Sequence, residues 1–312
     1  MEKVFLTEQI HPDAVAYLQK NFEVVQGSST EPAEIIRQAQ GCSAILIRSA
    51  KITAEIMDAI PTLKVVAKHG MGVDNIAVDH ATEKGILVVN APFSNLNAVA
   101  EHIVMLLLAL SKRTVRMDQL TRAGQFKERN TYKTVELKGA TVGIIGMGKI
   151  SRLVVKKLSG FEMNVLATDP YVTQADVEGL GITMVTPEEL YAKSDFVIVH
   201  TSLFPSTFHL VGAEQFKAMK KSAFIINAAR GSAIKQNELV EALKAGEIAG
   251  AGLDVYASEP LTSDEPLLAM DNVICTPHYA GFTTGAVVKT GIDVAESILS
   301  VMDGKTPKYL LK

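Results

Sequence analysis

Three polar residues with complementary acid–base chemistry follow predicted strands in the second half of the chain. Arg230 lies in the segment Asn-Ala-Ala-Arg-Gly, Glu259 in Asp-Val-Tyr-Ala-Ser-Glu-Pro, and His278 directly after Thr-Pro. A guanidinium can bind a carboxylate through paired hydrogen bonds and polarise an adjacent keto oxygen. An imidazolium (unperturbed pKa ~6.5) can protonate an alkoxide, and a carboxylate on its other ring nitrogen favours the charged form. Together the three residues suit hydride transfer at a 2-keto acid.

Each of these residues, taken singly, also fits a structural role. Arg230 can cap a helix or form a surface ion pair, Glu259 can be a solvated loop charge, and His278 can be a turn residue. Their shared position after strands of one predicted sheet favours the catalytic interpretation, because open α/β sheets bind ligands at that edge.

A glycine turn between a strand and a helix lies earlier in the same half. Residues 142–151 read VGIIGMGKIS, an apolar run that breaks into glycines and resumes as the helix Lys149–Leu158. Gly146 permits a tight turn, and Gly148 lets the backbone approach a pyrophosphate at the helix N-terminus. The pattern is typical of a dinucleotide-binding βαβ unit.

An acidic residue after the next strand completes this unit. Asp169 lies roughly 20 residues beyond the turn, where a carboxylate accepts hydrogen bonds from the adenosine ribose. A 2′-phosphate would meet like charge there, so the sequence predicts NAD rather than NADP. Ser151 stands at the third glycine position and is small enough to fit.

The elements that position these residues alternate between short apolar runs and amphipathic segments. In the first part of the chain, the predicted strands are Val4–Leu6, Ala44–Ile47, Leu63–Ala67 and Ile86–Val89, and the predicted helices are Pro12–Lys20, Pro32–Ala39, Ala54–Ala59 and Ile76–Glu83. A long helix is predicted from Ala98 to Ala123, ended by Gly124. Later strands are predicted at Val142–Ile145, Val165–Thr168, Phe196–Val199, Phe224–Ile226, Gly250–Leu253 and Val273–Cys275, and a last helix at Thr284–Val301.

This alternation predicts an α/β protein of two doubly wound parallel-sheet domains in tandem. Only the second carries the glycine turn. The long helix near Ala98 is the expected hinge, and a cleft between the domains is the expected ligand site.

Composition excludes several classes of protein. The chain has 312 residues, 47% of them hydrophobic, and a formal net charge of -3 without long charged runs, so neither nucleic acid nor a membrane is an expected partner. The most apolar stretch, Val99–Leu110, is too short to span a bilayer, and the first ten residues lack a signal-peptide pattern. Two distant cysteines, Cys42 and Cys275, suit a reduced cytoplasmic setting. No His or carboxylate cluster has metal-site spacing.

With these residues in view, the chain resembles the D-isomer-specific 2-hydroxyacid dehydrogenases, which include D-3-phosphoglycerate, D-lactate and glycerate/hydroxypyruvate dehydrogenases. The resemblance runs over nearly the whole length. It rests on the segment 68–75 (KHGMGVDN), on Asn90-Ala91-Pro92 with Val99–His102, on the glycine turn, and on the segments of the three polar residues.

The resemblance implies an oxidoreductase with a Rossmann NAD-binding domain (98–284) and a flavodoxin-like substrate domain (1–97 with 285–312). It implies that Arg230 binds substrate, that His278 is the acid/base, and that Glu259 supports it. It further implies that backbone N–H groups of Gly70, Met71 and Gly72 receive the substrate carboxylate. The implied cofactor-binding residues are Gly146, Gly148, Lys149, Ile150, Asp169, Thr207, Ala228, Ala229, Arg230, Asp254 (facing the nicotinamide), and His278 to Gly281. A homodimer, and a short form without a C-terminal regulatory domain, are also implied.

Four residues depart from the family pattern: Lys68, Ser151, Lys235 and Gly285. None removes a catalytic group, so they bear on packing and on substrate choice. Two other functions stay open, an NAD-binding sensor similar to the family's corepressors and a phosphonate dehydrogenase. A formate dehydrogenase is disfavoured because it needs no carboxylate on the histidine. Arg48, Lys68 and His69 can suit a second anionic group on the substrate, or can be solvated surface charges.

Overall fold

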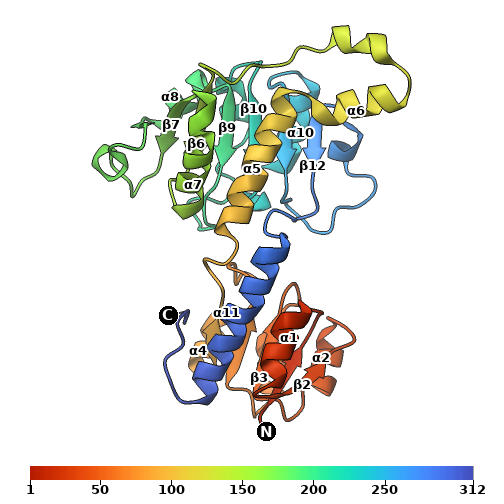
Figure 1. Cartoon of the computed structure of the whole chain (residues 1–312), viewed down its shortest axis with the longest axis vertical. Helices are drawn as coiled ribbons and strands as arrows, with labels where there is room; N and C mark the ends of the chain where they lie inside the picture. The colour runs from red at the N-terminus through yellow and green to blue at the C-terminus, as the bar shows by residue number, and fades with distance from the viewer. Residues whose placement is uncertain (312) are drawn as a thin grey trace. The chain divides into compact units, whose positions relative to one another are not determined.

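The computed structural model describes residues 1–311, which form two compact units (Figure 1). One unit combines Met1–Leu96 with the residues from Phe282 onward, and the other is Asn97–Gly281. The chain therefore leaves the first unit once and returns to it once. Among the described residues, no helix is both long and apolar enough to cross a membrane.

The first unit is built on a five-stranded parallel sheet in the order β2-β1-β3-β4-β5. Its strands are β1 (Lys3–Leu6), β2 (Glu23–Gln26), β3 (Ala44–Ile47), β4 (Val65–Lys68) and β5 (Leu87–Val89). This order is that of the flavodoxin-like doubly wound sheet. The predicted fold class is confirmed for this unit.

Helices cover both faces of this sheet because both sets of alternating strand side chains are apolar. One set packs with α1 (Pro12–Gln19) and α11 (Thr284–Met302), which lie side by side in Figure 1. The other set packs with α2 (Pro32–Gln38), α3 (Ala54–Asp58) and α4 (Val78–Glu83). The last long helix of the chain thus belongs to the core of the first unit.

The second unit is built on a seven-stranded parallel sheet in the order β12-β11-β10-β9-β6-β7-β8. Its strands are β6 (Thr141–Ile145), β7 (Asn164–Thr168), β8 (Ile182–Met184), β9 (Phe196–Val199), β10 (Phe224–Asn227), β11 (Gly250–Leu253) and β12 (Val273–Cys275). The strand order reverses at β6 and β9, as in a Rossmann sheet. The predicted fold class is confirmed for this unit as well.

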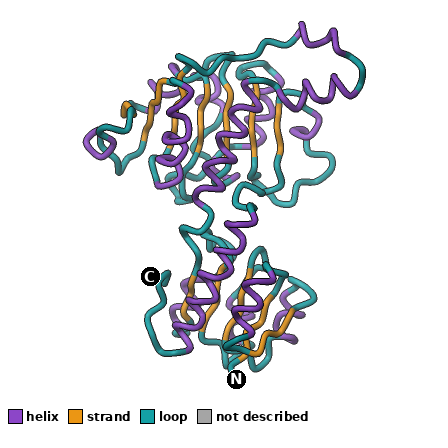
Figure 2. Tube along the Cα trace, viewed as in Figure 1, coloured by secondary structure: helices purple, strands orange, loops and turns teal. Residues whose placement is uncertain are grey.

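Helices cover both faces of the larger sheet (Figure 2), and the surroundings of two of its glycines are consistent with this. A Cβ at Gly143 would collide with Leu190 of α8 (Pro187–Lys193), and a Cβ at Gly252 would press on Leu106 and Leu110 of α5 (Leu96–Ser111). These glycines lie in adjacent rows of the sheet, whose side chains point to opposite faces. The remaining helices of this unit are α6 (Thr114–Arg122), α7 (Lys149–Leu158), α9 (Ala213–Ala218) and α10 (Gln236–Lys244).

The predicted continuous helix from Ala98 to Ala123 is wrong. It is interrupted after Ser111, and Arg113 adopts a left-handed backbone with φ of 50° before α6 begins. The helical sequence pattern continues across this point, but a residue with positive φ ends an α-helix. The sequence prediction also omits the short strands β2 and β8, which are only partly buried and therefore lack a continuous apolar run.

Candidate active site

The parallel register brings the carboxyl ends of six strands of the second unit into one row. Hydrogen-bonded pairing aligns Thr168, Ile145, Val199, Asn227, Leu253 and Cys275 across the sheet. The residues that follow them are Asp169, Gly146, His200, Ala228, Asp254 and Thr276. The sheet therefore places the glycine turn, the acid and the starts of the three candidate catalytic segments along one edge.

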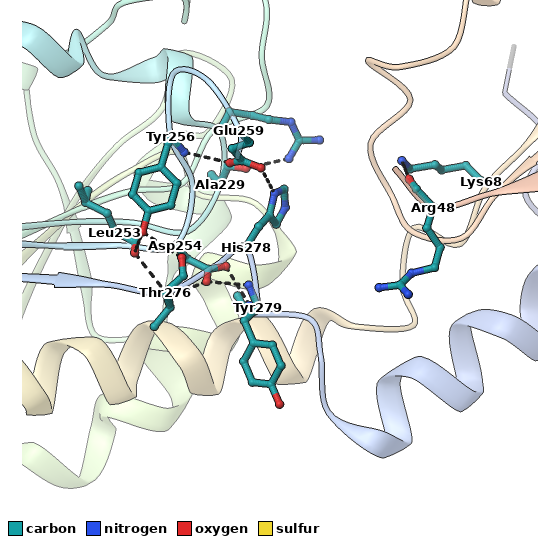
Figure 3. A network of polar contacts seen from close by, with 12 residues as sticks. Arg48, Lys68, Ala229, Leu253, Asp254, Tyr256, Glu259, Thr276, His278 and Tyr279 are labelled. Carbon is teal, nitrogen blue, oxygen red and sulfur yellow. Dashed lines mark hydrogen bonds and ion pairs between the residues drawn. The ribbon is translucent and has the colours of Figure 1, made fainter. Parts of the chain in front are cut away.

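His278 and Glu259 form a hydrogen-bonded ion pair at this edge (Figure 3). The His278 Nδ1 atom lies 2.7 Å from Glu259 Oε2, and the imidazole side chain is 59% exposed. The bond to Glu259 raises the pKa of His278 above its ordinary value, with a smaller contribution from Asp254 and opposition from burial and from Arg230. Because the carboxylate only accepts hydrogen bonds, Nδ1 carries a hydrogen and Nε2 remains for proton exchange.

Glu259 is suited to remain ionised beside the imidazole. Burial by itself would raise the pKa of this carboxyl, but the bonds from His278 and from the N–H of Tyr256, with the charge of Arg230, lower it overall. Glu259 Oε1 accepts the Tyr256 N–H at 3.0 Å, which holds the carboxylate in place. The structure thus brings the three sequence-predicted catalytic residues together.

Arg230 is positioned by its own loop and by close backbone packing. The Asn227 side chain donates to the Arg230 carbonyl at 2.9 Å and accepts from the Ala229 N–H at 3.0 Å. The next residue, Gly231, packs so tightly that a Cβ would lie 1.9 Å from the Tyr256 carbonyl oxygen. The loop of Arg230 and the loop of Glu259 therefore rest on each other through a position that only glycine can fill.

Asp254 lies behind the loop that carries His278. Its side chain is fully buried, and its oxygens accept the N–H groups of Tyr279 at 2.7 Å and Ala280 at 2.8 Å. The His278 N–H donates to the Asp254 carbonyl at 2.9 Å, and His278 itself has a left-handed φ of 52°. A non-glycine residue in that region persists only where its surroundings hold it.

The glycine turn after β6 has the geometry that a bound pyrophosphate needs. Gly146 has φ of 91°, and a Cβ there would lie 2.4 Å from the His200 carbonyl oxygen. A Cβ at Gly148, by contrast, would meet nothing within 4 Å, which leaves open space before the first turn of α7. Ser151 is buried, and its hydroxyl donates to the Gly146 carbonyl at 2.6 Å. The serine at the third glycine position thus braces the turn.

Asp169 is tied to the same turn. Its Oδ2 atom accepts the Met147 N–H at 2.8 Å, and its Oδ1 atom accepts the Tyr171 N–H at 2.8 Å. Each carboxylate oxygen has a second lone pair, so both can still accept a ribose hydroxyl. The two backbone bonds fix the direction in which the carboxylate is presented.

The other residues implied for cofactor binding differ in which polar groups they leave available to a ligand. Lys149 and Ile150 begin α7, but the Ile150 side chain is buried, which leaves its backbone for a ligand. Ala228 and Ala229 are buried after β10, and Gly281 is the last residue of the second unit. The Thr207 hydroxyl donates to the Ser202 carbonyl at 2.7 Å and accepts the Phe204 N–H at 2.8 Å, so it organises its own loop.

Two residues that the sequence interpretation missed stand directly after β9. The Nδ1 atom of His200 and the hydroxyl of Thr201 are buried and have no hydrogen-bond partner within the described chain. Burial, with the nearby charge of Arg230, lowers the pKa of His200 to about 4, so its ring is neutral near pH 7. Unpartnered buried polar groups are costly, which favours a ligand partner here. Their position immediately after a predicted strand was the signal that could have identified them.

In the first unit, the loop Gly70-Met71-Gly72 follows β4. The Gly70 N–H donates to the Lys68 carbonyl at 2.9 Å, whereas the N–H groups of Met71 and Gly72 have no acceptor among residues 1–311. The Asn90 side chain donates to the Met71 carbonyl at 2.7 Å and holds the loop. Two of the three implied N–H donors are therefore available to a carboxylate.

Of the three cationic candidates near this loop, only Arg48 keeps an outward-facing charge. The Lys68 ammonium donates to the Arg48 carbonyl (Figure 3) and to Asn75 Oδ1. Burial lowers the pKa of His69 to about 4, so this imidazole is neutral. The Arg48 guanidinium donates to the Gln9 carbonyl at 3.3 Å, stacks over Phe282 at 4.7 Å, and has no carboxylate partner in the described chain.

No group of three or more His, Cys, Asp or Glu side chains among the described residues is arranged to hold a metal ion. The chemistry available at the sheet edge is that of a guanidinium, an imidazole–carboxylate pair and backbone donors.

Comparison with known proteins identifies the family. Residues 104–280 match the model of the D-isomer specific 2-hydroxyacid dehydrogenase NAD binding domain. The chain belongs to this family, and the predicted resemblance is confirmed.

Two curated relatives and one solved structure are closely similar. The chain is 40% identical to D-3-phosphoglycerate dehydrogenase of Archaeoglobus fulgidus over 97% of its own length and 58% of the relative's, so it spans little more than half of that protein. It is 34% identical to glyoxylate reductase of Korarchaeum cryptofilum over 99% of its own length and 95% of the relative's. An NADPH-dependent glyoxylate/hydroxypyruvate reductase of Sinorhizobium meliloti, solved with NADP and malonate, superposes with a TM-score of 0.89 at 28% identity, covering 99% of this chain and 96% of that one.

The geometry of the ion pair predicts the effect of Glu259→Gln on His278. The substitution removes the carboxylate that raises the pKa of the imidazole, so that pKa falls. An NMR titration of the His278 ring measures it directly. Glu265→Gln is the matched control, because Glu265 accepts from Gln236 rather than from His278, and it leaves the titration unchanged. A rise in the pKa, or no change, in the Glu259 variant would contradict the pairing.

Proposed function

We propose that this protein is an NAD(H)-dependent D-2-hydroxyacid dehydrogenase that reversibly reduces a small 2-keto acid. The observation that carries the proposal is the His278–Glu259 pair at 2.7 Å, with the charge of Arg230 acting on both residues. An imidazole with raised pKa and an available Nε2 is the group that acid/base chemistry at a keto oxygen requires.

Each residue has a defined task in this proposal. A bound nicotinamide cofactor supplies the hydride to the carbonyl carbon during reduction. Arg230 binds the substrate carboxylate and polarises the keto oxygen. His278 gives its Nε2 proton to the developing alkoxide and becomes neutral, and it accepts that proton in the reverse direction. Glu259 keeps the ring oriented and favours its charged form.

The sheet edge supports a dinucleotide as cofactor. The open space at Gly148, the N-terminus of α7 and the two unpartnered groups of His200 and Thr201 suit phosphates and hydroxyls. We assign NAD rather than NADP, because the fixed carboxylate of Asp169 would face a 2′-phosphate. The S. meliloti reductase, solved with NADP, makes this choice worth testing directly.

The substrate class is narrowed by Arg48. We propose that the keto acid carries a second anionic group that this guanidinium binds, as in phosphohydroxypyruvate. The names of the relatives include both a phosphorylated substrate, in D-3-phosphoglycerate dehydrogenase, and glyoxylate, which lacks a second anionic group. The charge of the Arg48 guanidinium, which has no carboxylate partner among the described residues, favours a substrate with a second anionic group.

A sensor that binds NAD without turnover is the main alternative, and a phosphonate dehydrogenase is the other. The complete Arg230, Glu259 and His278 set argues against a sensor, which needs no acid/base. A homodimer and a cytoplasmic location remain predictions from the sequence.

A panel of 2-keto acids tests the reaction. NADH oxidation is measured with pyruvate, hydroxypyruvate, glyoxylate, phosphohydroxypyruvate and oxaloacetate, for the unmodified protein and for Arg230→Lys. Lysine keeps the charge but loses the bidentate fork, so kcat/KM falls on the order of 10²-fold while NADH binding is retained. NADH binding with no turnover on any substrate would favour the sensor, and near-normal kcat/KM of the variant would remove Arg230 from the site.

The cofactor assignment is tested with Asp169→Ala. The unmodified protein should prefer NADH over NADPH on the order of 10²-fold in kcat/KM, since like-charge contacts cost several kcal/mol. The variant loses the repulsion, which narrows the preference. It also loses the acceptor of the Met147 N–H, which raises KM for both cofactors. Equal use of both cofactors by the unmodified protein would overturn this interpretation of Asp169.

The second anionic group is tested with Arg48→Gln. We expect KM for phosphohydroxypyruvate to rise on the order of 10-fold or more, as for a lost charge-assisted hydrogen bond, with glyoxylate little affected. Arg37→Gln is the control, because Arg37 pairs with Glu34 on the surface. Equal losses for both substrates would contradict the assignment.

A further inference from the structure

A buried polar chain lies behind the loop that carries His278, entirely within the second unit. It consists of His102 on α5, Thr276 after β12, and Asp254 after β11 (the last two labelled in Figure 3). His102 Nε2 lies 3.0 Å from the Thr276 hydroxyl, which lies 2.6 Å from Asp254 Oδ1. His102 Nε2 is also 3.5 Å from the same carboxylate oxygen. The three side chains connect a helix on one face of the sheet to the catalytic edge.

The direction of these hydrogen bonds follows from the chemistry of the groups. The Asp254 carboxylate accepts, so the Thr276 hydroxyl donates its only hydrogen to it. The hydroxyl oxygen is then left to accept, and His102 must carry its hydrogen on Nε2. Burial lowers the pKa of His102, although Asp254 opposes this, so the ring acts as a neutral donor. The direction of the His102–Thr276 hydrogen bond thus depends on that of the Thr276–Asp254 bond.

Asp254 also binds the backbone of the loop that carries the catalytic histidine. Its two oxygens hold the N–H groups of Tyr279 and Ala280, and its carbonyl holds that of His278. These three consecutive N–H groups fix the loop in which His278 has a left-handed backbone. Without them, the imidazole would not be held in line with Glu259.

We propose that His102 and Thr276 are positioning residues that lock the Asp254 carboxylate and, through it, the orientation and proton affinity of His278. The inference rests on the proposed function, in which His278 is the acid/base. Neither residue touches the reacting atoms.

A purely structural role would not require this arrangement. The side chain of His102 is 10% exposed and that of Asp254 is fully buried, where polar groups are costly unless they are paired. A fully satisfied network of buried polar groups makes its surroundings rigid and selects one geometry. The geometry specified here is that of the loop 278–280, because within residues 1–311 every donor to Asp254 other than His102 and Thr276 comes from that loop.

The experiment compares removal of each bond with its conservative replacement. Thr276→Val keeps the side-chain shape but loses the hydroxyl, and His102→Leu loses the donor. Thr276→Ser and His102→Gln retain a hydroxyl and an N–H donor in matching places. Ser111→Ala is the matched control, because it removes a buried hydroxyl from the same helix as His102, bonded only to the Leu108 carbonyl.

Two readouts are expected to change together. The charged groups that act on His278 are Glu259, Asp254 and Arg230, and both contributions that raise its pKa depend on the loop geometry. In Thr276→Val and His102→Leu, the NMR titration of His278 in the free protein therefore shifts to lower pH. The fall of keto-acid reduction with rising pH shifts the same way, because reduction needs the imidazolium. In Thr276→Ser, His102→Gln and Ser111→Ala, the His278 titration and the pH profile of reduction stay close to those of the unmodified protein.

The outcomes separate this inference from the proposed function. Lower thermal stability with an unmoved His278 titration in both apolar variants would overturn the positioning role. Equal shifts in the conservative and the apolar variants would also overturn it. If the unmodified protein shows no turnover with any keto acid, the proposed function fails, and the NMR titration still decides whether this chain controls His278. Should Thr276→Val fail to fold, the His102 pair gives the same comparison.

Discussion

Parallel pairing in one register is the constraint on which the rest of the second unit depends. Six strands end in a common row, from Thr168 on β7 to Cys275 on β12. Each strand therefore delivers its next residue to the same edge, and the N–H groups of Gly146, His200, Asp254 and Thr276 still bond to the end of a neighbouring strand there. Residues of different strands, such as Gly146 and His200, become neighbours at this edge because their strands pair side by side.

Local contacts then convert this shared edge into a defined geometry. Gly231 lets the loop of Arg230 lie against the backbone at Tyr256, and Glu259 holds the N–H of Tyr256 while it orients His278. Asp254 holds the other side of the His278 loop. The exposed imidazole is thus supported from both sides by carboxylates, one that pairs with the ring and one that holds the backbone.

The first unit uses a carboxylate in a similar structural manner. Glu8, after β1, accepts the N–H groups of Arg48, Ser49 and Ala50. Burial raises the pKa of Glu8, but the bond from the Ser49 hydroxyl and these three backbone bonds lower it overall. Lys68 holds the Arg48 carbonyl from the other side. The backbone of Arg48 is therefore held from both sides, while its guanidinium contacts the Gln9 carbonyl and the Phe282 ring.

The sequence by itself determined the two doubly wound sheets, most of their strands and helices, and the chemistry of the catalytic candidates. These features depend on apolar periodicity, on the glycine turn, and on residue types directly after strands, all of which are local patterns. Tertiary structure alone decided three other matters. It broke the long helix at Arg113, where a left-handed backbone interrupts a continuing helical pattern. It showed that Lys68 is held internally and His69 is neutral, leaving Arg48 as the outward charge, because burial and partners set the state of an ionisable group. It also connected His102 to Asp254 across 152 positions, since hydrogen bonds between distant segments leave no periodic signal in the chain.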